Sequence, residues 1–186
     1  MPTWRPWLEE QSDQVFEESE YCRRYRSLLE NRQLQDMLSA GHVKIIFHIH
    51  PKLKEFLKAF QTENSNVELI EQGTRPLNEL IMECSMLLTD YSSVSWDVYY
   101  LGKPVVFYQF DYDLYMQANG SYLDMKKELF GDRYITEEKV IAGLGEYMQN
   151  DFREKAKYGS LRQEYFAYND QNNCKRILEF LKSKGY

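Results

Sequence analysis

The sequence has no hydrophobic run long enough to cross a membrane, and no apolar signal core near its first residue. Cysteine is scarce: Cys22, Cys84 and Cys174 are far apart and form no Cys-x-x-Cys pair. An odd, scattered set of cysteines argues against a disulfide framework or a cysteine zinc site, and is typical of the reducing cytoplasm. We therefore expect a cytoplasmic protein.

The sequence also lacks an excess of positive charge, because it has 23 Lys and Arg residues and 29 Asp and Glu residues. Binding along nucleic acid depends on clustered cations, so we expect no nucleic-acid partner. Any phosphate site in this chain must be local. It would be built from a few backbone N–H groups and one or two cations.

Hydrophobic residues make up 43% of the 186 residues and charged residues 28%, which is ordinary for a globular protein. The length suits one domain with a sizeable core. There is no internal repeat, low-complexity tract or linker. We expect residues 1–186 to form a single domain.

Short apolar runs alternate with helical patterns along the chain. Apolar or β-branched residues predict strands at 43–50, 67–70, 86–89 and 105–108. Helical spacing predicts helices at 17–40, 52–60, 76–84, 93–100, 137–148 and 170–182. Strands that are almost wholly apolar indicate a parallel sheet with helices on both faces, so the predicted fold class is α/β and Rossmann-like.

Ligands of parallel sheets bind outside the carboxyl ends of the strands. Three polar segments fall at those ends: His50, residues 89–93, and residues 109–113. The segment Thr89-Asp-Tyr-Ser92-Ser93 lies between a strand and a helix, and a helix start offers unpaired N–H groups to a phosphate. The alternative is that one serine merely caps the helix.

Asp97 lies one helical turn beyond Ser93 and is a candidate for the same cleft; it is equally a favourable acid in a first helical turn. His50 is a candidate acid or base, because Pro51 ends the strand just after it. His48 suits the core or a supporting position behind His50. Two histidines without a third ligand make no recognisable metal site.

The segment Thr3-Trp4-Arg5 brings a permanent cation onto a stiff, proline-flanked loop. The planar guanidinium of Arg5 suits bidentate contact with phosphate, although a terminal arginine is more often solvated surface. Lys52, directly after the His-Pro pair, is a similar case.

Several ordered motifs together resemble the CDP-glycerol glycerophosphotransferase family of teichoic acid and polyol-phosphate polymer biosynthesis. They are Met-Pro-Thr-Trp-Arg at 1–5, His50-Pro51, Thr-Asp-Tyr-Ser-Ser-Val at 89–94, Trp96-Asp97, Lys-Pro-Val-Val-Phe-Tyr at 103–108, Asp111 near Tyr115, and residues 124–136. The sequence departs from the family at Trp96, where Phe is usual, and at Asn119 and Phe130, which precede glycines where Arg and Pro are frequent.

The resemblance implies the C-terminal, nucleotide-binding half of a glycosyltransferase B-type fold, with the acceptor-binding N-terminal domain outside this chain. It implies a CDP-linked polyol donor, a lipid-linked polymer acceptor, and a place at the cytoplasmic face of the membrane. His50 would be one of two functional histidines. Thr3, Arg5, Lys52, Thr89, Ser92, Ser93 and Asp97 would bind the donor.

The reaction implied is attack of a terminal hydroxyl on the β-phosphorus of CDP-glycerol, with CMP as the leaving group. The sequence indicates no cofactor and no metal, and leaves open a divalent cation that accompanies the diphosphate. Two other functions stay open: a sugar-nucleotide-dependent glycosyltransferase domain and a non-catalytic nucleotide-binding module.

Overall fold

The computed structural model describes residues 1–71 and 73–185. Its strands are β1 (Ile45–His48), β2 (Val67–Ile70), β3 (Leu87–Thr89), β4 (Val105–Tyr108) and β5 (Asp132–Tyr134). Every strand pairing among these residues is parallel. The α/β class with parallel strands, predicted from the apolar runs, is confirmed.

The strands form two sheets, with β1 beside β2 in one and the order β3-β4-β5 in the other. The parallel sheet expected from the sequence is therefore divided into two among the described residues. The strand β5 was also missed, because Asp-Arg-Tyr at 132–134 is not an apolar run.

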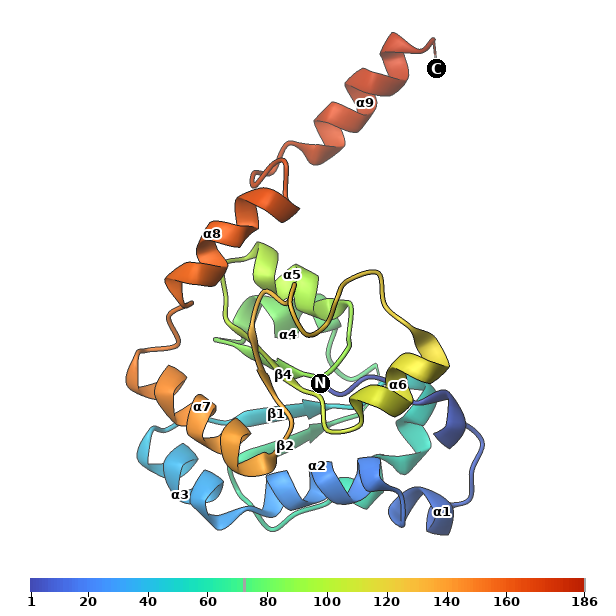
Figure 1. Cartoon of the computed structure of the whole chain (residues 1–186), viewed down its shortest axis with the longest axis vertical. Helices are drawn as coiled ribbons and strands as arrows, with labels where there is room; N and C mark the ends of the chain where they lie inside the picture. Colours follow the sequence, from blue (N-terminus) through green and yellow to red (C-terminus); the bar gives the residue numbers. More distant parts are fainter. Residues whose placement is uncertain (72, 186) are drawn as a thin grey trace.

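Helices cover both faces of the strands (Figure 1). On one side lie α1 (Asp13–Glu17), α2 (Glu20–Glu30), α3 (Arg32–Ala40) and α7 (Glu137–Gln149); on the other lie α4 (Leu77–Glu83) and α5 (Val94–Tyr100). The remaining helical segments are η1 (Pro6–Leu8), η2 (Pro51–Phe60), α6 (Tyr112–Asn119), α8 (Ala156–Tyr165) and α9 (Asn173–Ser183).

The single helix expected at 17–40 is divided by two capping residues. Ser19 Oγ accepts a hydrogen bond from Cys22 N, and Asn31 Oδ1 accepts one from Leu34 N. Each cap satisfies an N–H group that a continuous helix would have bonded internally, so a new helix begins there. The helices α6 and α8 were not predicted from the sequence.

Two apolar clusters hold the elements together. The larger packs α1, α2, α3, η2 and α7 against β1, and includes the stacked rings of Phe16 and Phe56, 4.1 Å apart. The smaller packs α5 and α8 against β3 and β4, around Tyr99 and Phe130. Beyond α8, the helix α9 leads away from this body (Figure 1). Within the described ranges, no helix combines the length and apolar character needed to span a membrane.

Candidate functional site at the strand ends

The carboxyl ends of β1, β3 and β4 meet along one side of the molecule, and the first five residues join them. The N–H of Thr3 donates to Asp90 Oδ1 at 2.8 Å, and the N–H of Tyr91 donates to Thr3 Oγ1 at 3.3 Å. The next residue, Trp4, stacks on His50 with the ring centroids 6.1 Å apart. Adjacent residues of one segment thus link the β3 loop to the end of β1.

Arg5 lies behind this surface and has no exposed area. Its Nη2 is 2.8 Å from Asp90 Oδ2, its Nε is 2.7 Å from Asp111 Oδ2, and its Nη1 donates to the carbonyl oxygen of Thr3 at 2.8 Å. The expectation that Arg5 contacts the donor phosphate is therefore wrong for this structure. Two buried carboxylates already use the guanidinium, and burial of that charge is tolerable only because they balance it.

Burial and ion pairing together determine the pKa values of Asp90 and Arg5. Burial by itself would raise the pKa of Asp90, but the charge of Arg5 and the hydrogen bonds from Thr3 and Tyr91 lower it below its usual value. Burial opposes the charged form of Arg5, yet the nearby Asp90 and Asp111 raise its pKa well above the ordinary range. Both partners consequently stay ionised at neutral pH.

Two tyrosines cover the buried cation. The rings of Tyr91 and Tyr115 stack in parallel 3.7 Å apart, and the guanidinium carbon of Arg5 lies 5.0 Å from each ring centroid. The hydroxyl of Tyr91 donates to Asp111 Oδ1 at 3.1 Å. These contacts fix the backbone just before Ser92. Neither Tyr91 nor Asp90 was expected to have a role from the sequence, although both belong to the Thr-Asp-Tyr-Ser-Ser-Val motif.

Ser92 and Ser93 open into a cavity of about 660 Å³. Ser93 is exposed and makes no side-chain cap, while Ser92 Oγ accepts a hydrogen bond from Val94 N at 3.3 Å. The other walls are mainly aromatic and aliphatic and include Trp96, Tyr115, Asn119, Gly120, Tyr122, Leu123 and Met125. The cavity therefore combines hydroxyl groups with flat apolar surfaces, which suits a nucleotide.

Two further residues expected at the donor do not line this cavity. Thr89 is buried, and its hydroxyl donates to the carbonyl oxygen of Met1 at 2.6 Å. Asp97 is exposed on the first turn of α5 and is absent from the cavity wall. The strand-end position of Thr89 turns its side chain into the fold, and the helical position of Asp97 turns its carboxylate to solvent.

His50 lies at the edge of the site and is half-buried. Its Nδ1 accepts a hydrogen bond from Lys52 N at 3.3 Å, so His50 caps η2 and directs Nε2 away from that backbone. Burial lowers the pKa of His50, and the charge of Lys52 lowers it further. Its imidazole is accordingly neutral at pH 7, and because Nδ1 accepts a hydrogen bond, its proton lies on Nε2.

Lys52 is exposed beside His50, with Nζ 4.0 Å from the Trp4 ring centroid and 3.0 Å from Glu9 Oε1. It remains at the site surface as a cation. His48 is buried, as expected of a core histidine, and burial lowers its pKa. Among residues 1–71 and 73–185, no three His, Cys, Asp or Glu side chains are grouped as they would be around a metal ion.

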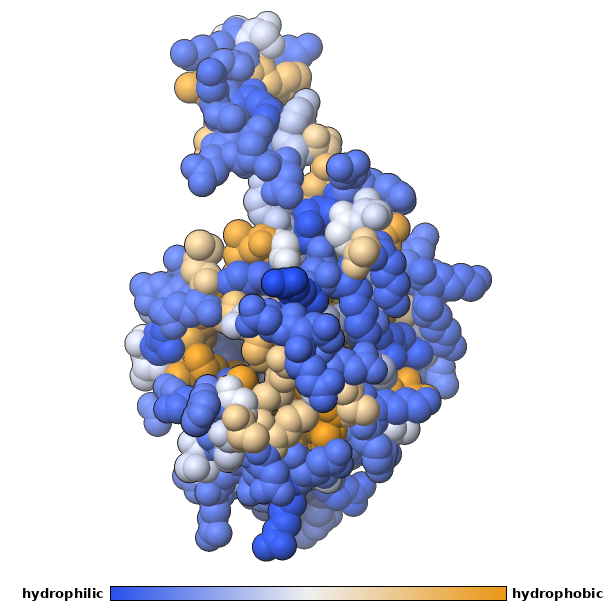
Figure 2. Space-filling model, turned by 90° about the vertical axis from the view of Figure 1, so that its left-hand side faces the viewer, coloured by the Kyte–Doolittle hydropathy of each residue, from blue (hydrophilic) through white to orange (hydrophobic). Residues whose placement is uncertain are grey.

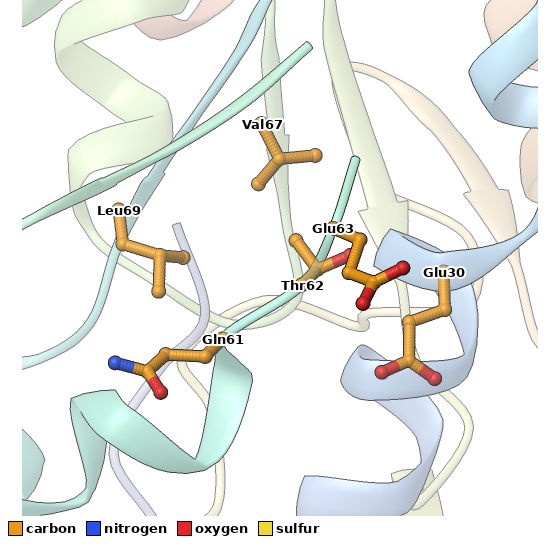
Figure 3. Close-up of a pocket in the computed structure, with 6 residues that line it drawn as sticks. All are labelled: Glu30, Gln61, Thr62, Glu63, Val67 and Leu69. Carbon is orange, nitrogen blue, oxygen red and sulfur yellow. The ribbon is translucent and has the colours of Figure 1, made fainter. Parts of the chain in front are cut away.

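A second open cavity of about 660 Å³ lies at the outer edge of β2. Figure 3 shows its lining residues, which include the carboxylates of Glu30 and Glu63 and the amide of Gln61. The lining contains no cation. Two carboxylates would repel a diphosphate, so this cavity is a poor candidate for the donor site.

Residues 1–183 match the family model described as CDP-Glycerol:Poly(glycerophosphate) glycerophosphotransferase. The chain belongs to this family. It is 31% identical over 186 residues to the minor teichoic acid biosynthesis protein GgaB of Bacillus subtilis, and the alignment covers 95% of this chain but 20% of that protein. With the teichoic acid poly(glycerol phosphate) polymerase of Bacillus subtilis it shares 26% identity, over 95% of this chain and 22% of the relative.

Solved structures of the wall teichoic acid polymerase TagF share the fold of this chain. One matches with a TM-score of 0.68 at 22% identity, covering 99% of this chain and 42% of that one. Another, of a variant soaked with CDPG, matches with a TM-score of 0.68 at 23% identity. This chain thus spans about a fifth of the length of these two relatives and less than half of the TagF chain.

Proposed function

We propose that this chain supplies the donor-binding half of an enzyme that transfers a polyol phosphate, such as glycerol phosphate, from a CDP-linked donor to a growing polymer. One observation supports it most: the Ser92–Ser93 loop opens into a cavity of nucleotide size and is held by the buried network below it. Family membership over residues 1–183 supports the same reaction class.

In this proposal the diphosphate lies against Ser92 and Ser93, with hydroxyl and backbone N–H groups as donors. The aromatic faces of Tyr115 and Tyr122 offer stacking surface for the cytosine ring. Lys52, which is exposed near His50, supplies a cation for charge that develops on the phosphates.

The reaction is a direct displacement at the β-phosphorus. An acceptor hydroxyl oxygen forms a bond to that phosphorus, the bond from phosphorus to the bridging oxygen breaks, and CMP leaves. The acceptor proton passes to a base. His50 is neutral and its Nδ1 accepts a hydrogen bond, so its Nε2–H donates and stabilises charge on the phosphates. It serves as the base only if Lys52 N releases Nδ1 and the proton moves to that nitrogen.

The acceptor in this proposal is lipid-linked and is bound by polypeptide outside this chain, at the cytoplasmic face of the membrane. A cleft of the glycosyltransferase B type has two walls, and this chain forms one. We expect the isolated chain to bind CDP-glycerol weakly and to release no CMP, as measured by calorimetric titration and a turnover assay. Sustained CMP release by the purified chain would contradict the proposal that catalysis also needs the acceptor-binding polypeptide.

A related alternative is a sugar-nucleotide-dependent glycosyltransferase, which would use the same diphosphate site. The same titration distinguishes them when CDP-glycerol, CDP-ribitol and UDP-glucose are compared at equal concentration. Preference for the UDP-sugar would favour the alternative. Binding of nucleotides without any turnover in a longer protein would instead favour a non-catalytic module.

The two serines give the most direct test of the donor site. We expect the variant Ser92→Ala/Ser93→Ala to lose about 1–3 kcal/mol of CDP-glycerol binding, because hydrogen bonds to a charged group are removed. Ser160→Ala is the matched control, since Ser160 is exposed on α8 and bonds only locally to Ala156. Unchanged affinity in the double variant would rule out this placement of the diphosphate.

A further inference from the structure

Two cations lie over one aromatic ring near the carboxyl end of β5. The guanidinium carbon of Arg133 is 4.9 Å from the centroid of the Tyr112 ring, and Nζ of Lys126 is 4.4 Å from the same centroid. Arg133 belongs to β5, Tyr112 begins α6, and Lys126 lies in the loop 120–131 between them. Figure 1 shows this chain leaving α6 in yellow, passing α5 and returning toward α7 in orange. Three segments therefore meet beside the strand ends.

A buried amide holds Arg133 in place. Gln109 has no exposed area, and its Oε1 accepts a hydrogen bond from Nε of Arg133 at 2.6 Å. The Nε2 of Gln109 donates to the carbonyl oxygen of Asp90 at 2.9 Å, so the same side chain is tied to the loop that leads to Ser92. Arg133 itself is half-buried. With its Nε fixed, its terminal nitrogens Nη1 and Nη2 remain, and their spacing suits bidentate contact with a phosphate.

The loop 120–131 fixes the backbone of Lys126 and leaves its side chain exposed. The N–H of Lys126 donates to Asp124 Oδ1 at 2.9 Å. The other oxygen of this carboxylate, Asp124 Oδ2, is 3.6 Å from Nζ of Lys127. Asp124 thus pairs with the neighbouring lysine, and the ammonium group of Lys126 is held over Tyr112 without it.

Neither of the two cations has an acidic partner. Among the described residues, no carboxylate lies within ion-pair distance of the Arg133 guanidinium or of Lys126 Nζ. Most other cations that lie over aromatic rings do have such a partner, namely Arg5, Lys52, Lys155, Lys157, Arg162 and Arg176. Two like charges over one ring repel each other, so contact with the ring alone does not account for the pair. An anion between them would balance both charges.

The cation pair borders the cavity at Ser92 and Ser93 but lies outside it. Met125 lines that cavity, its Sδ is 3.8 Å from Gln109 Nε2, and Lys126 follows it directly in the chain. Neither cation is part of the cavity lining. Met125 and Gln109 therefore lie between the cavity and the guanidinium of Arg133.

The side from which β1 and β2 start has a different surface. Figure 2 looks onto that side, and apolar residues gather there around a hollow. Apolar side chains offer a phosphate no hydrogen bond to replace those it makes with water. We therefore expect phosphate groups to bind at the carboxyl ends of the strands, where Arg133 lies.

We propose that Arg133 and Lys126 form a binding site for the phosphate group of a phosphate ester, next to the donor cavity and separate from Ser92 and Ser93. Arg133 binds two phosphate oxygens through Nη1 and Nη2, and Lys126 supplies the second positive charge. The proposed function offers two sources of such a group, the donor diphosphate and the phosphodiesters of the growing polymer. The site itself rests on the contacts of Arg133 and Lys126 and does not depend on that function.

Titration of the purified chain at low ionic strength tests the site. The probes are CDP-glycerol, a short glycerol-phosphate oligomer without lipid, and inorganic phosphate. We expect a phosphate ester to shift the NMR signal of the Arg133 Nε–H group saturably. By calorimetry, Arg133→Met and Lys126→Met should each weaken binding of that ester about 10- to 100-fold, because charge-assisted hydrogen bonds are lost. Arg133→Lys keeps the charge without the bidentate geometry and should bind with intermediate affinity.

The three probes distinguish the sources of the phosphate group. A shift caused by CDP-glycerol that disappears in Ser92→Ala/Ser93→Ala assigns the donor diphosphate. A shift caused by the oligomer that persists in this double variant assigns the polymer, and also shows that this site is intact when the donor site fails. Binding of inorganic phosphate alone, or no shift with any probe, would overturn the proposal.

Lys127→Met is the matched control, because it removes the same charge from the adjacent residue, which is exposed and already paired with Asp124. It should change the affinity by less than about 3-fold. Lys126 is exposed, so Lys126→Met is expected to melt as the parent does and keeps the test valid if Arg133→Met is less stable. Equal weakening by Lys127→Met would reduce the effect to general charge and overturn the site. Unchanged affinity in a well-folded Lys126→Met would do the same.

Discussion

Replacing His50 by alanine is expected to lower turnover about 100- to 10,000-fold in a full-length transferase that contains this chain. His50 is the imidazole at the carboxyl end of β1, its Nδ1 is taken by Lys52 N, and its lowered pKa keeps it neutral. Because Nδ1 accepts a hydrogen bond, the neutral imidazole carries its proton on Nε2, so in this arrangement the outward nitrogen donates to a phosphate oxygen and stabilises its charge. CMP release under saturating donor and acceptor measures the effect.

Because His50 also caps η2, the alanine variant loses some stability together with its chemistry. His50→Asn separates the two effects, since asparagine is among the best N-cap residues and has no basic nitrogen. We expect His50→Asn to melt near the parent temperature and still to lack turnover. Restored turnover in this variant would assign His50 a purely structural role.

The opposite pattern is expected for His48→Ala. His48 is buried among core residues, so its loss should lower the melting temperature more than the turnover of the protein that remains folded.

The pH profile adds a second test of His50. A base with a lowered pKa is protonated only below its ordinary value of 6.5, so the acid limb of turnover attributable to His50 should lie below pH 6.5.

The sequence predicted the parts of the fold that have a strong local signal. The strands at 67–70 and 105–108 are apolar runs and appear with those boundaries. The helix at 137–149 follows its apolar spacing closely. The strand at 132–134 gave no such signal, because its pairing with β4 comes from tertiary contact and not from local composition.

The sequence places His50, the 89–93 loop and residues 109–113 at the carboxyl ends of strands, and the structure has them there. The structural role of Arg5 could not be predicted from its position in the sequence. Its partners Asp90 and Asp111 are 85 and 106 residues away in the chain. Only the folded structure shows that they enclose the guanidinium, which converts an expected phosphate ligand into a buried structural cation.

This assignment predicts a large loss of stability for Arg5→Met. The substitution keeps an unbranched side chain but leaves two carboxylates in the core without their cation. Removing one partner of a buried ion pair typically costs about 3–5 kcal/mol, a large part of the stability of an ordinary domain. Chemical denaturation of the purified chain measures the change. A phosphate ligand on a solvated loop would instead lower donor affinity and leave the unfolding free energy nearly unchanged.

Two controls and a pH dependence make the Arg5 prediction specific. Arg24→Met breaks an exposed pair with Glu20 and should cost less than about 1 kcal/mol. In the parent, the pKa of Asp90 lies below 3.8, so the stability that this ionised carboxylate contributes is present above pH 3.8 and is lost as the pH falls further. In Arg5→Met, burial without the cation raises the pKa of Asp90. The buried carboxylate then lowers the unfolding free energy of the variant as the pH rises and it becomes ionised. The difference in unfolding free energy between parent and variant should therefore shrink as the pH is lowered toward 3.8. A difference that stays constant or grows in acid would show that Arg5 does not balance these carboxylates.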